Sequence, residues 1–413
     1  MFRCLSAVCG VAVGSCLTVK CLNYFEDRNL LNAGNVGLKS KNLELKLVQV
    51  LFRHGARTPL KLIPGLEETV WNKYELRYDL EHTKLEHELR SLRAGELPEE
   101  KTLTRDVLRG GCLMGQMTVV GQQQTFDLGR ELKKLYIDNL NFIGDTFDPN
   151  TVFLRTTNIE RTIESLRCVV AGMFTDIKEP VIFWTLPIAD DILFPNWQTC
   201  KALRQYIKYC FQTGYRLPGY KEDLEMFSKM VGQPLFKKTF IEIYDDLNCR
   251  TAHNKTYPEN IKSFMNVIEK HALQHLSDSF LSPPDWTKGL VLPLSSGQLL
   301  QNLYENMKSK VSKTNEYKLY LYSIHDTTLI TLFSAFDMKL DKWPPFAAYI
   351  SLELYENKDG GHFVRMLYCG DVVKFKKCNK ELLPLSEFKE IVTPLIVDDV
   401  DKACQTIFHI PEH

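Results

Sequence analysis

The sequence predicts an α/β fold: a central, mostly parallel sheet with helices on both faces, an inserted mainly helical cap and a C-terminal β-hairpin. Three apolar runs have the length and the β-branched or aromatic content of buried strands, at residues 45–52, 151–154 and 317–324. Sequences with helical periodicity follow the second and third runs, and strands that alternate with helices favour parallel pairing. Two later runs, 349–354 and 363–368, flank an Asp-Gly-Gly turn and predict the hairpin.

Two helices are predicted beside these strands. One spans residues 118–136, where the small residues Gly121 and Gly129 permit close packing. The other is expected to begin at Thr157, because Thr157 and Glu160 have the spacing of a capping box. The apolar faces comprise Leu128, Leu132, Leu135 and Tyr136 in the first helix and Ile159, Ile163, Leu166, Val170 and Met173 in the second.

We divide the chain into a body, a cap and an N-terminal segment. Residues 187–284 are rich in Lys, Tyr and helix-forming residues and contain no strong strand, so we interpret them as the helical cap. The α/β body then comprises residues 40–186 and 285–413. Residues 1–30 form a separate targeting or signal segment.

The composition narrows the class of protein. Of 413 residues, 44% are hydrophobic, which is ample for a large core. Lys+Arg and Asp+Glu both number 51, and the resulting net charge of +0 argues against nucleic acid as a partner. The 12 cysteines show no zinc-type spacing but allow disulfides. The pairs Cys369–Cys378 and Cys200–Cys249 both stay open, and Cys168 is expected to be a buried thiol.

The N-terminal segment is apolar but short. Small or apolar residues predominate from Cys4 to Val19, and no acidic residue precedes Glu26. The apolar stretch is shorter than the roughly 20 residues that a membrane-spanning helix needs. A cleaved secretory signal and a mitochondrial targeting sequence are both compatible with it, and composition slightly favours secretion.

The most informative stretch is Arg53-His54-Gly55-Ala56-Arg57-Thr58-Pro59, directly after the first strand. Two guanidinium groups suit a phosphate dianion, because each can bind two oxygens at once. Their positive charge also keeps the histidine between them neutral, and a neutral imidazole is a nucleophile. Arg155 follows the second strand, and His325-Asp326 follows the third. Ligands of open α/β sheets bind beyond the carboxyl ends of the strands, so we expect these residues to converge on one crevice.

Residues 53–59 resemble the signature of the histidine acid phosphatases, the branch of the histidine phosphatase superfamily that includes prostatic acid phosphatase and phytases. The related mutase branch lacks both the Arg-x-Pro continuation and a late His-Asp pair, which is present here as His325-Asp326. The resemblance implies an acid phosphatase that hydrolyses phosphate monoesters through a phosphohistidine, without a metal ion or another cofactor.

The resemblance also implies the role of each site residue. His54 is the nucleophile, and Asp326 protonates the leaving group. Phosphate is bound by Arg53, Arg57, Arg155 and His325. Arg161 stands one residue closer to Arg155 than in the family pattern, so the resemblance favours Arg155 over Arg161.

Several stretches outside the site are similar to the lysophosphatidic acid phosphatases within this family: residues 45–50, 110–112, 194–200, 252–254 and 342–347. This similarity implies a monomeric mitochondrial enzyme that converts a lysophospholipid, lysophosphatidic acid, to monoacylglycerol and phosphate, with peripheral membrane contact. It thereby opposes the slight preference of the composition for the secretory pathway or lysosome.

Two other functions stay open. An acid phosphatase for another phosphomonoester, such as an inositol phosphate, phosphoprotein or phosphosugar, would have the same chemistry. A pocket for a highly phosphorylated inositol should contain additional Lys and Arg. A catalytically inactive lipid-binding protein is the second alternative, and the intact site residues argue against it.

Residues 75–101 are densely charged, including Glu86-His87-Glu88-Leu89-Arg90. We interpret them as a solvated helical face, and the alternative is a lip beside the pocket that meets headgroups. For a single-chain lipid phosphate we expect an apolar channel bordered by residues 71–89 and by the cap.

Overall fold

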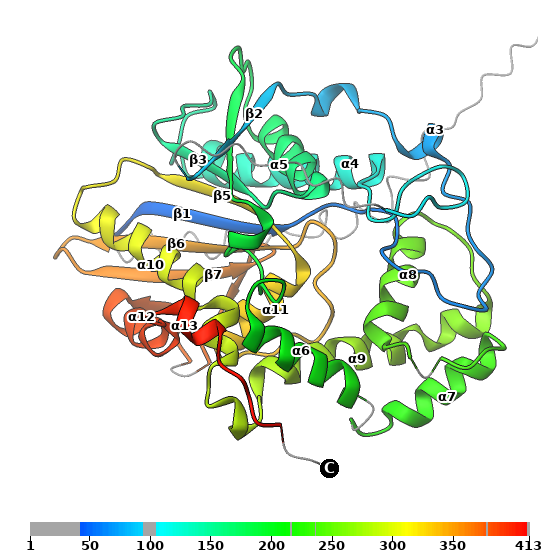
Figure 1. Ribbon diagram of the computed structural model, residues 1–413. Coiled ribbons are helices and arrows are strands. Elements are labelled where there is room, and N and C mark those ends of the chain that lie inside the picture. Colours follow the sequence, from blue (N-terminus) through cyan, green and yellow to red (C-terminus); the bar gives the residue numbers. More distant parts are fainter. Residues whose placement is uncertain (1–41, 94–104, 215–216, 236, 377–378, 411–413) are drawn as a thin grey trace, which may run out of the picture.

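The computed structural model describes residues 42–93, 105–214, 217–235, 237–376 and 379–410. They form a mixed α/β structure around one nine-stranded sheet (Figure 1). The strand order is β2-β4-β3-β5-β1-β6-β7-β8, and β9 also pairs with β7. The predicted fold class is confirmed.

The sheet has a parallel and an antiparallel part. The strands β2, β4, β3, β5 and β1 pair in parallel. The predicted hairpin β6–β7 extends the sheet beside β1 by antiparallel pairing. The last seven residues of β1 and all of β5 are buried, because helices cover both faces of the sheet. The strands are β1 (Leu43–Arg53), β2 (His87–Ser91), β3 (Val152–Thr156), β4 (Val181–Thr185), β5 (Leu319–Ile324), β6 (Tyr349–Asn357), β7 (His362–Tyr368), β8 (Asp371–Val373) and β9 (Leu382–Pro384).

Figure 1 shows α4 and α5 level with β3 and β5 in the upper part of the molecule, and α11 and α12 lower than β7. Gly129 lets α4 and α5 meet closely, since a Cβ there would lie 2.2 Å from the carbonyl oxygen of Val169. None of the described helices is long and apolar enough to cross a membrane. The helices are α3 (Lys73–Leu76), α4 (Val119–Leu132), α5 (Glu160–Met173), α6 (Lys201–Thr213), α7 (Tyr220–Met230), α8 (Phe240–Ala252), α9 (Glu259–Leu281), α10 (Gln298–Val311), α11 (Asp326–Ala335), α12 (Leu385–Val392) and α13 (Val400–Cys404).

The start of α5 differs from the prediction. Ile159 is the N-cap residue, and no side chain caps the helix. The Thr157 hydroxyl instead contacts Thr162 Oγ1 at 2.7 Å and His325 Nε2 at 3.2 Å. The predicted capping box is therefore wrong, because Thr157 belongs to the network around His325. The predicted apolar face is buried except for Ile159, which is half-buried.

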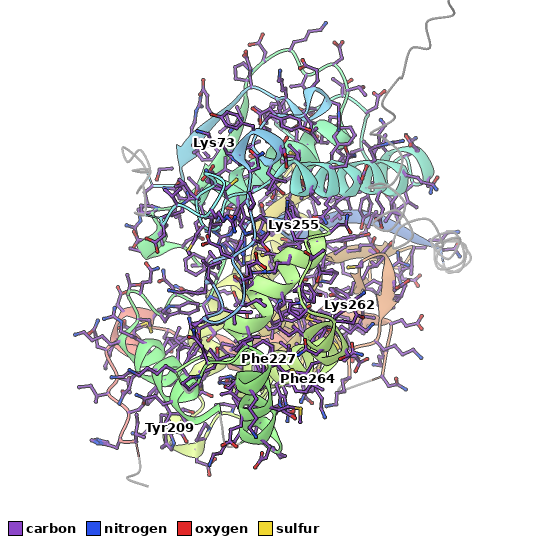
Figure 2. The ribbon with its side chains drawn as sticks, turned by 90° about the vertical axis from the view of Figure 1, so that its right-hand side faces the viewer. Lys73, Tyr209, Phe227, Lys255, Lys262 and Phe264 are labelled. Atoms are coloured by element: carbon purple, nitrogen blue, oxygen red, sulfur yellow. A yellow bond between two sulfur atoms is a disulfide. The ribbon has the colours of Figure 1, made fainter. Side chains whose placement is uncertain are left out.

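Helices α6 to α9 pack around a second hydrophobic core. Phe227 of α7 and Phe264 of α9 stack there with ring centroids 6.4 Å apart (Figure 2). Ile330 of α11 and Trp343 also belong to this core, so it continues into the α/β body.

The disulfide found in the structure joins Cys200 to Cys404. This excludes the Cys200–Cys249 pair that the sequence left open, and Cys249 is a buried thiol on α8. A bond between Cys369 and Cys378 lies outside the described residues, since Cys378 is not among them. Cys168 is buried as predicted, and its burial raises the pKa of the thiol to about 11.

The densely charged region, residues 75–101, contains an edge strand of the sheet, so its interpretation as a helical face is wrong. Residues 87–91 form β2, which pairs in parallel with β4. Glu88 and Arg90 are exposed, whereas His87 and Leu89 are half-buried, as the alternation of a strand requires. Residues 94–101 lie outside the described part of the chain.

Candidate active site

The strands β1, β5 and β3 are neighbours and end at the same edge of the sheet. Arg53 at the end of β1 is level with Ile324 of β5, and Thr156 of β3 is level with Ser323. His54 follows β1 and donates its backbone N–H to the Ile324 carbonyl at 3.1 Å. His325 is the N-cap residue of α11, and its ring centroid lies 5.6 Å from that of His54. The structure thus brings together the two predicted histidines.

The loop after β1 packs directly on the start of α4. A Cβ on Gly55 would lie 2.2 Å from the carbonyl oxygen of Gly121, so no larger residue fits at Gly55 without moving the backbone. Ser165 Oγ accepts the Gly55 N–H at 3.0 Å, and Gln124 Oε1 accepts the Ala56 N–H at 2.9 Å. These contacts fix the loop that carries His54.

His54 has the protonation state of a nucleophile. Its Nδ1 lies 2.9 Å from the Gly55 carbonyl oxygen, which can only accept a hydrogen bond. Nδ1 therefore carries the proton, and Nε2 keeps its lone pair. Burial, followed by the charges of Arg161 and Arg57, holds the pKa of His54 well below its ordinary value.

Arg53 and Asp326 form an ion pair with 2.6 Å between Nη2 and Oδ2. Trp343 Nε1 donates to the same carboxylate oxygen at 3.1 Å, and the Arg53 guanidinium lies 4.2 Å from the centre of the Phe346 ring. Burial raises the pKa of Asp326, but Arg53, Arg57 and the Trp343 hydrogen bond together hold it below its ordinary value. Asp326 is therefore a carboxylate when the pocket is empty.

Arg57 is paired with a residue that we did not predict from the sequence. Its Nη2 lies 2.7 Å from Asp245 Oδ1 on α8, and Asp245 Oδ2 accepts the Leu60 N–H at 2.7 Å. Burial opposes the charge of Arg57, but Asp245 outweighs it and raises the pKa of Arg57. Asp245 has no distinguishing local pattern, because its role depends on α8 packing against the loop after β1.

Arg57 and Arg161 line the pocket, whereas two of the predicted phosphate-binding residues, Arg155 and Arg53, which pairs with Asp326, do not. Arg155 is buried and pairs with Asp191, with 3.2 Å between Nη2 and Oδ1, and it is not among the pocket-lining residues. Arg161 does line the pocket, and its buried Nε has no hydrogen-bond partner within the described part of the chain. Burial and the charge of Arg57 lower the pKa of Arg161 to about 9. Arg161 is thus a cation that an anionic ligand would stabilise.

These groups open into a cavity of about 750 Å³. Its wall beyond the end that holds His54, Arg57 and Arg161 is largely apolar and comes from residues 187–198, at the start of the predicted cap. The prediction that residues 71–89 border the channel is wrong, because none of them lines the cavity. The lining residues are His54, Arg57, Leu60, Arg93, Ile159, Arg161, Pro187, Ile188, Ala189, Asp190, Phe194, Trp197, Gln198, His325, Asp326 and Thr327.

Arg161→Ala should lower kcat/KM about 10²–10³-fold, the usual loss for one donor to a developing charge, with little change in the free energy of unfolding. Arg155→Ala should instead lower the free energy of unfolding by about 3–5 kcal/mol, because it leaves Asp191 buried without its partner. Steady-state kinetics and urea unfolding of both variants distinguish the two roles. A greater kinetic loss in folded Arg155→Ala than in Arg161→Ala would restore the original assignment.

His253 links the cap to the same loop. Its Nδ1 donates to the Cys249 carbonyl at 2.7 Å, and its Nε2 lies 2.7 Å from Thr118 Oγ1. Thr118 in turn donates its backbone N–H to the Ala56 carbonyl at 3.1 Å. Burial lowers the pKa of His253 to about 4.

Because His253 is buried, its pKa is about 4 in the folded protein, against 6.5 as the ordinary value expected in the unfolded chain. The neutral ring therefore contributes its full stability above pH 6.5, and this contribution is lost as the pH falls from 6.5 to 4. Between pH 7.5 and pH 5, His253 should therefore cost about 2 kcal/mol of the free energy of unfolding. Between pH 7.5 and pH 5, the free energy of unfolding measured with urea should fall about 2 kcal/mol less for His253→Asn than for the wild type. An identical pH dependence in both proteins would contradict the assignment.

Within the described residues, no group of three His, Cys, Asp or Glu could hold a metal ion. The expectation that activity needs no metal stays a prediction, which dialysis against a chelator tests.

Comparison with known proteins identifies the family. The model of the histidine phosphatase superfamily (branch 2) matches residues 44–369. The chain is 35% identical over 354 residues to lysophosphatidic acid phosphatase type 6 of Homo sapiens, covering 84% of this chain and 82% of that protein. It is 28% identical over 397 residues to prostatic acid phosphatase of Bos taurus, covering 89% of each. Hafnia alvei phytase in complex with tartrate shares the fold, with a TM-score of 0.61 at 14% identity over 89% of this chain and 99% of that one. The chain therefore belongs to branch 2 of the histidine phosphatase superfamily and is a histidine acid phosphatase, an enzyme that hydrolyses phosphate monoesters.

Proposed function

We propose that this enzyme removes phosphate from lysophosphatidic acid through a phosphohistidine on His54. The observation that carries the proposal is the position of Arg161, a half-buried cation that forms no ion pair with a carboxylate of the described residues, in a cavity that also contains the neutral His54 and a long apolar wall. Such a cavity suits a ligand with an anionic head and an apolar tail.

In the first step, His54 Nε2 attacks phosphorus, the Nε2–P bond forms and the P–O bond to glycerol breaks. Arg57, Arg161 and His325 stabilise the charge on the transferring group. Asp326 gives a proton to the leaving alkoxide. This proton arrives with the substrate, which at acid pH is a monoanion because the second pKa of a phosphate monoester is about 6. Transfer of its proton to Asp326 leaves a dianion that Arg57 and Arg161 stabilise, and the charge of that dianion raises the pKa of Asp326 above its value in the empty pocket.

In the second step, water attacks the phosphohistidine. Asp326 accepts a proton from the water as the O–P bond forms and the Nε2–P bond breaks. Inorganic phosphate leaves, and His54 returns to its neutral state. Asp245, which pairs with Arg57 in the empty pocket, competes with the product phosphate for Arg57 and so favours its release.

The lining of the cavity favours a lipid over a highly phosphorylated inositol. Beyond Arg57 and Arg161, Arg93 is the one further cation among its described lining residues, and Arg93 pairs with Asp190 at 2.9 Å. The apolar wall consists of Leu60, Ile159, Pro187, Ile188, Ala189, Phe194 and Trp197. The name of the human relative agrees with this substrate. A mitochondrial location and a monomeric state rest on sequence similarity alone and are part of the proposal.

The substrate is tested with a series of lysophosphatidates of increasing chain length and glycerol phosphate, all below the concentration at which micelles form. Each buried methylene stabilises the complex by about 0.8 kcal/mol, so kcat/KM should rise by orders of magnitude and then fall when the chain exceeds the cavity. Trp197→Ala should flatten the rise and leave glycerol phosphate unaffected. A flat series for the wild type, or faster release of phosphate from phytate or phosphotyrosine, would contradict the lipid substrate.

A further inference from the structure

The outer face of α6 is basic from Lys201 to Lys208. Lys201, Arg204 and Lys208 are exposed, and the helix contains no Asp or Glu. At 100° per residue they share an arc of roughly 80° with Phe211, in a stripe roughly 15 Å long. The Phe211 side chain is 46% exposed. The exposed residues of the neighbouring helix α7, by contrast, mix both charges: Lys221, Glu222, Glu225 and Lys229.

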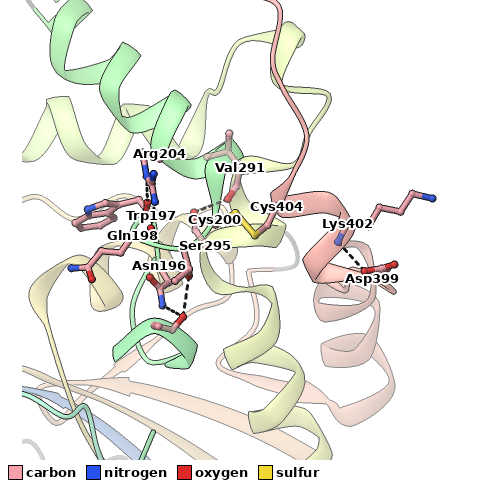
Figure 3. Close-up of a disulfide and its surroundings, with 12 residues drawn as sticks. Asn196, Trp197, Gln198, Cys200, Arg204, Val291, Ser295, Asp399, Lys402 and Cys404 are labelled. Carbon is pink, nitrogen blue, oxygen red and sulfur yellow. Dashed lines mark hydrogen bonds between the residues drawn. A yellow bond between two sulfur atoms is a disulfide. The ribbon is translucent and has the colours of Figure 1, made fainter. Parts of the chain in front are cut away.

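This stripe begins at the edge of the active-site cavity. Arg204 Nε donates to the Trp197 carbonyl at 3.1 Å, and its guanidinium also donates to the Gln198 carbonyl (Figure 3). Trp197 and Gln198 both line the cavity, and Trp197 is 37% exposed. The Cys200–Cys404 disulfide holds the start of α6 against α13. The helix therefore has a fixed position relative to the cavity.

A second hollow, of about 620 Å³, continues the positive charge away from the active site. Lys208, Lys237 and Lys238 line it, and Glu242 is the one carboxylate among its described lining residues. Glu242 pairs with Lys238 at 3.4 Å. In the described part of the chain, no ion pair joins Lys201, Lys208 or Lys237 to a carboxylate. The α6 stripe and this hollow together contain five basic residues, Lys201, Arg204, Lys208, Lys237 and Lys238, and one carboxylate, in a chain whose formal net charge is +0.

We propose that this basic face, defined by Lys201, Arg204, Lys208, Phe211 and Lys237, docks on an anionic lipid bilayer. Basic residues along one side of a helix, with aromatic residues at its ends, are typical of interfacial binding to anionic lipids. Docking places the cavity opening beside Trp197 at the membrane surface, where a single-chain lipid phosphate enters without crossing water. This last consequence rests on the proposed substrate, whereas the docking itself does not.

Binding is measured with the full chain, by co-sedimentation with phosphatidylcholine vesicles with and without phosphatidylserine. We expect binding to the anionic vesicles alone, weakened by salt. The triple variant Lys201→Gln/Lys208→Gln/Lys237→Gln should bind them roughly 100-fold more weakly, at about five-fold for each lysine. A matched variant of three other exposed lysines, Lys134→Gln/Lys358→Gln/Lys389→Gln, should bind like the wild type.

Kinetics separate this proposal from the proposed substrate. Both triple variants should hydrolyse a soluble aryl phosphate like the wild type, which also shows that they are folded. On lysophosphatidate embedded in anionic vesicles, the basic-face variant should lose at least about ten-fold in kcat/KM. A different result is that the wild type and both variants bind vesicles as expected and yet hydrolyse neither embedded nor monomeric lysophosphatidate. That result would contradict the proposed substrate and leave the docking proposal supported.

Three results would overturn the docking proposal: equal binding to neutral and anionic vesicles, undiminished binding of the basic-face variant, or no vesicle binding at low salt. Binding of a soluble polyanion such as heparin in place of vesicles would also overturn it and would indicate an acidic macromolecule as the partner.

Discussion

Replacing His54 by alanine should lower kcat by at least about 10⁴-fold on every phosphomonoester, because the covalent route then has no nucleophile. His54 Nε2 is unprotonated, since Nδ1 donates to the Gly55 carbonyl and burial, together with the neighbouring positive charge, holds the pKa of the ring well below its ordinary value. Wild-type enzyme mixed with substrate and quenched within milliseconds should carry acid-labile phosphate on His54, detectable by mass spectrometry under alkaline conditions.

His253→Asn serves as a control for this experiment, because His253 is a buried histidine that does not line the cavity. It should keep its phosphohistidine signal at neutral pH. Phosphate trapped on a residue other than His54, or turnover in His54→Ala close to that of the wild type, would refute the nucleophile assignment.

Replacing Asp326 by asparagine should slow phosphoenzyme formation by about 10²–10⁴ on alkyl phosphates, the usual range for loss of a general acid. Asparagine keeps the shape of the side chain beside Arg53 and Trp343 but cannot transfer a proton. The loss should be much smaller on aryl phosphates, because their leaving groups need little protonation. Rapid-quench measurements on both types of substrate give the rate of phosphoenzyme formation in the wild type and in Asp326→Asn, and thus the loss on each type.

Equal losses on alkyl and aryl substrates would instead assign Asp326 to positioning Arg53, with which it pairs at 2.6 Å. Thermal unfolding provides the control, because Asp326→Asn removes one partner of a nearly buried ion pair. A large drop in the melting temperature together with equal kinetic losses would identify a structural role.

The sequence by itself determined the framework of this protein. The strands β1, β3 and β5 could be predicted because they are short, continuous apolar runs, and burial on both faces leaves such runs few other structures. The site residues His54, Arg57, His325 and Asp326 could be located because each follows one of the buried strands or its adjoining loop. Parallel strands bring their carboxyl ends to one edge, so local patterns were sufficient to predict the convergence.

Only the tertiary structure decided which charges meet in the pocket. Arg161 lies in the first turn of α5 and lines the pocket, whereas Arg155 belongs to β3 and pairs with Asp191. Asp245 became the partner of Arg57, and Cys404 the partner of Cys200, across 188 and 204 residues of sequence. Such contacts depend on how α6 and α8 pack against distant parts of the chain, and no local pattern encodes this packing. The same packing makes residues 187–198 the apolar wall, so the shape of the substrate site follows from the tertiary structure and its chemistry from the sequence.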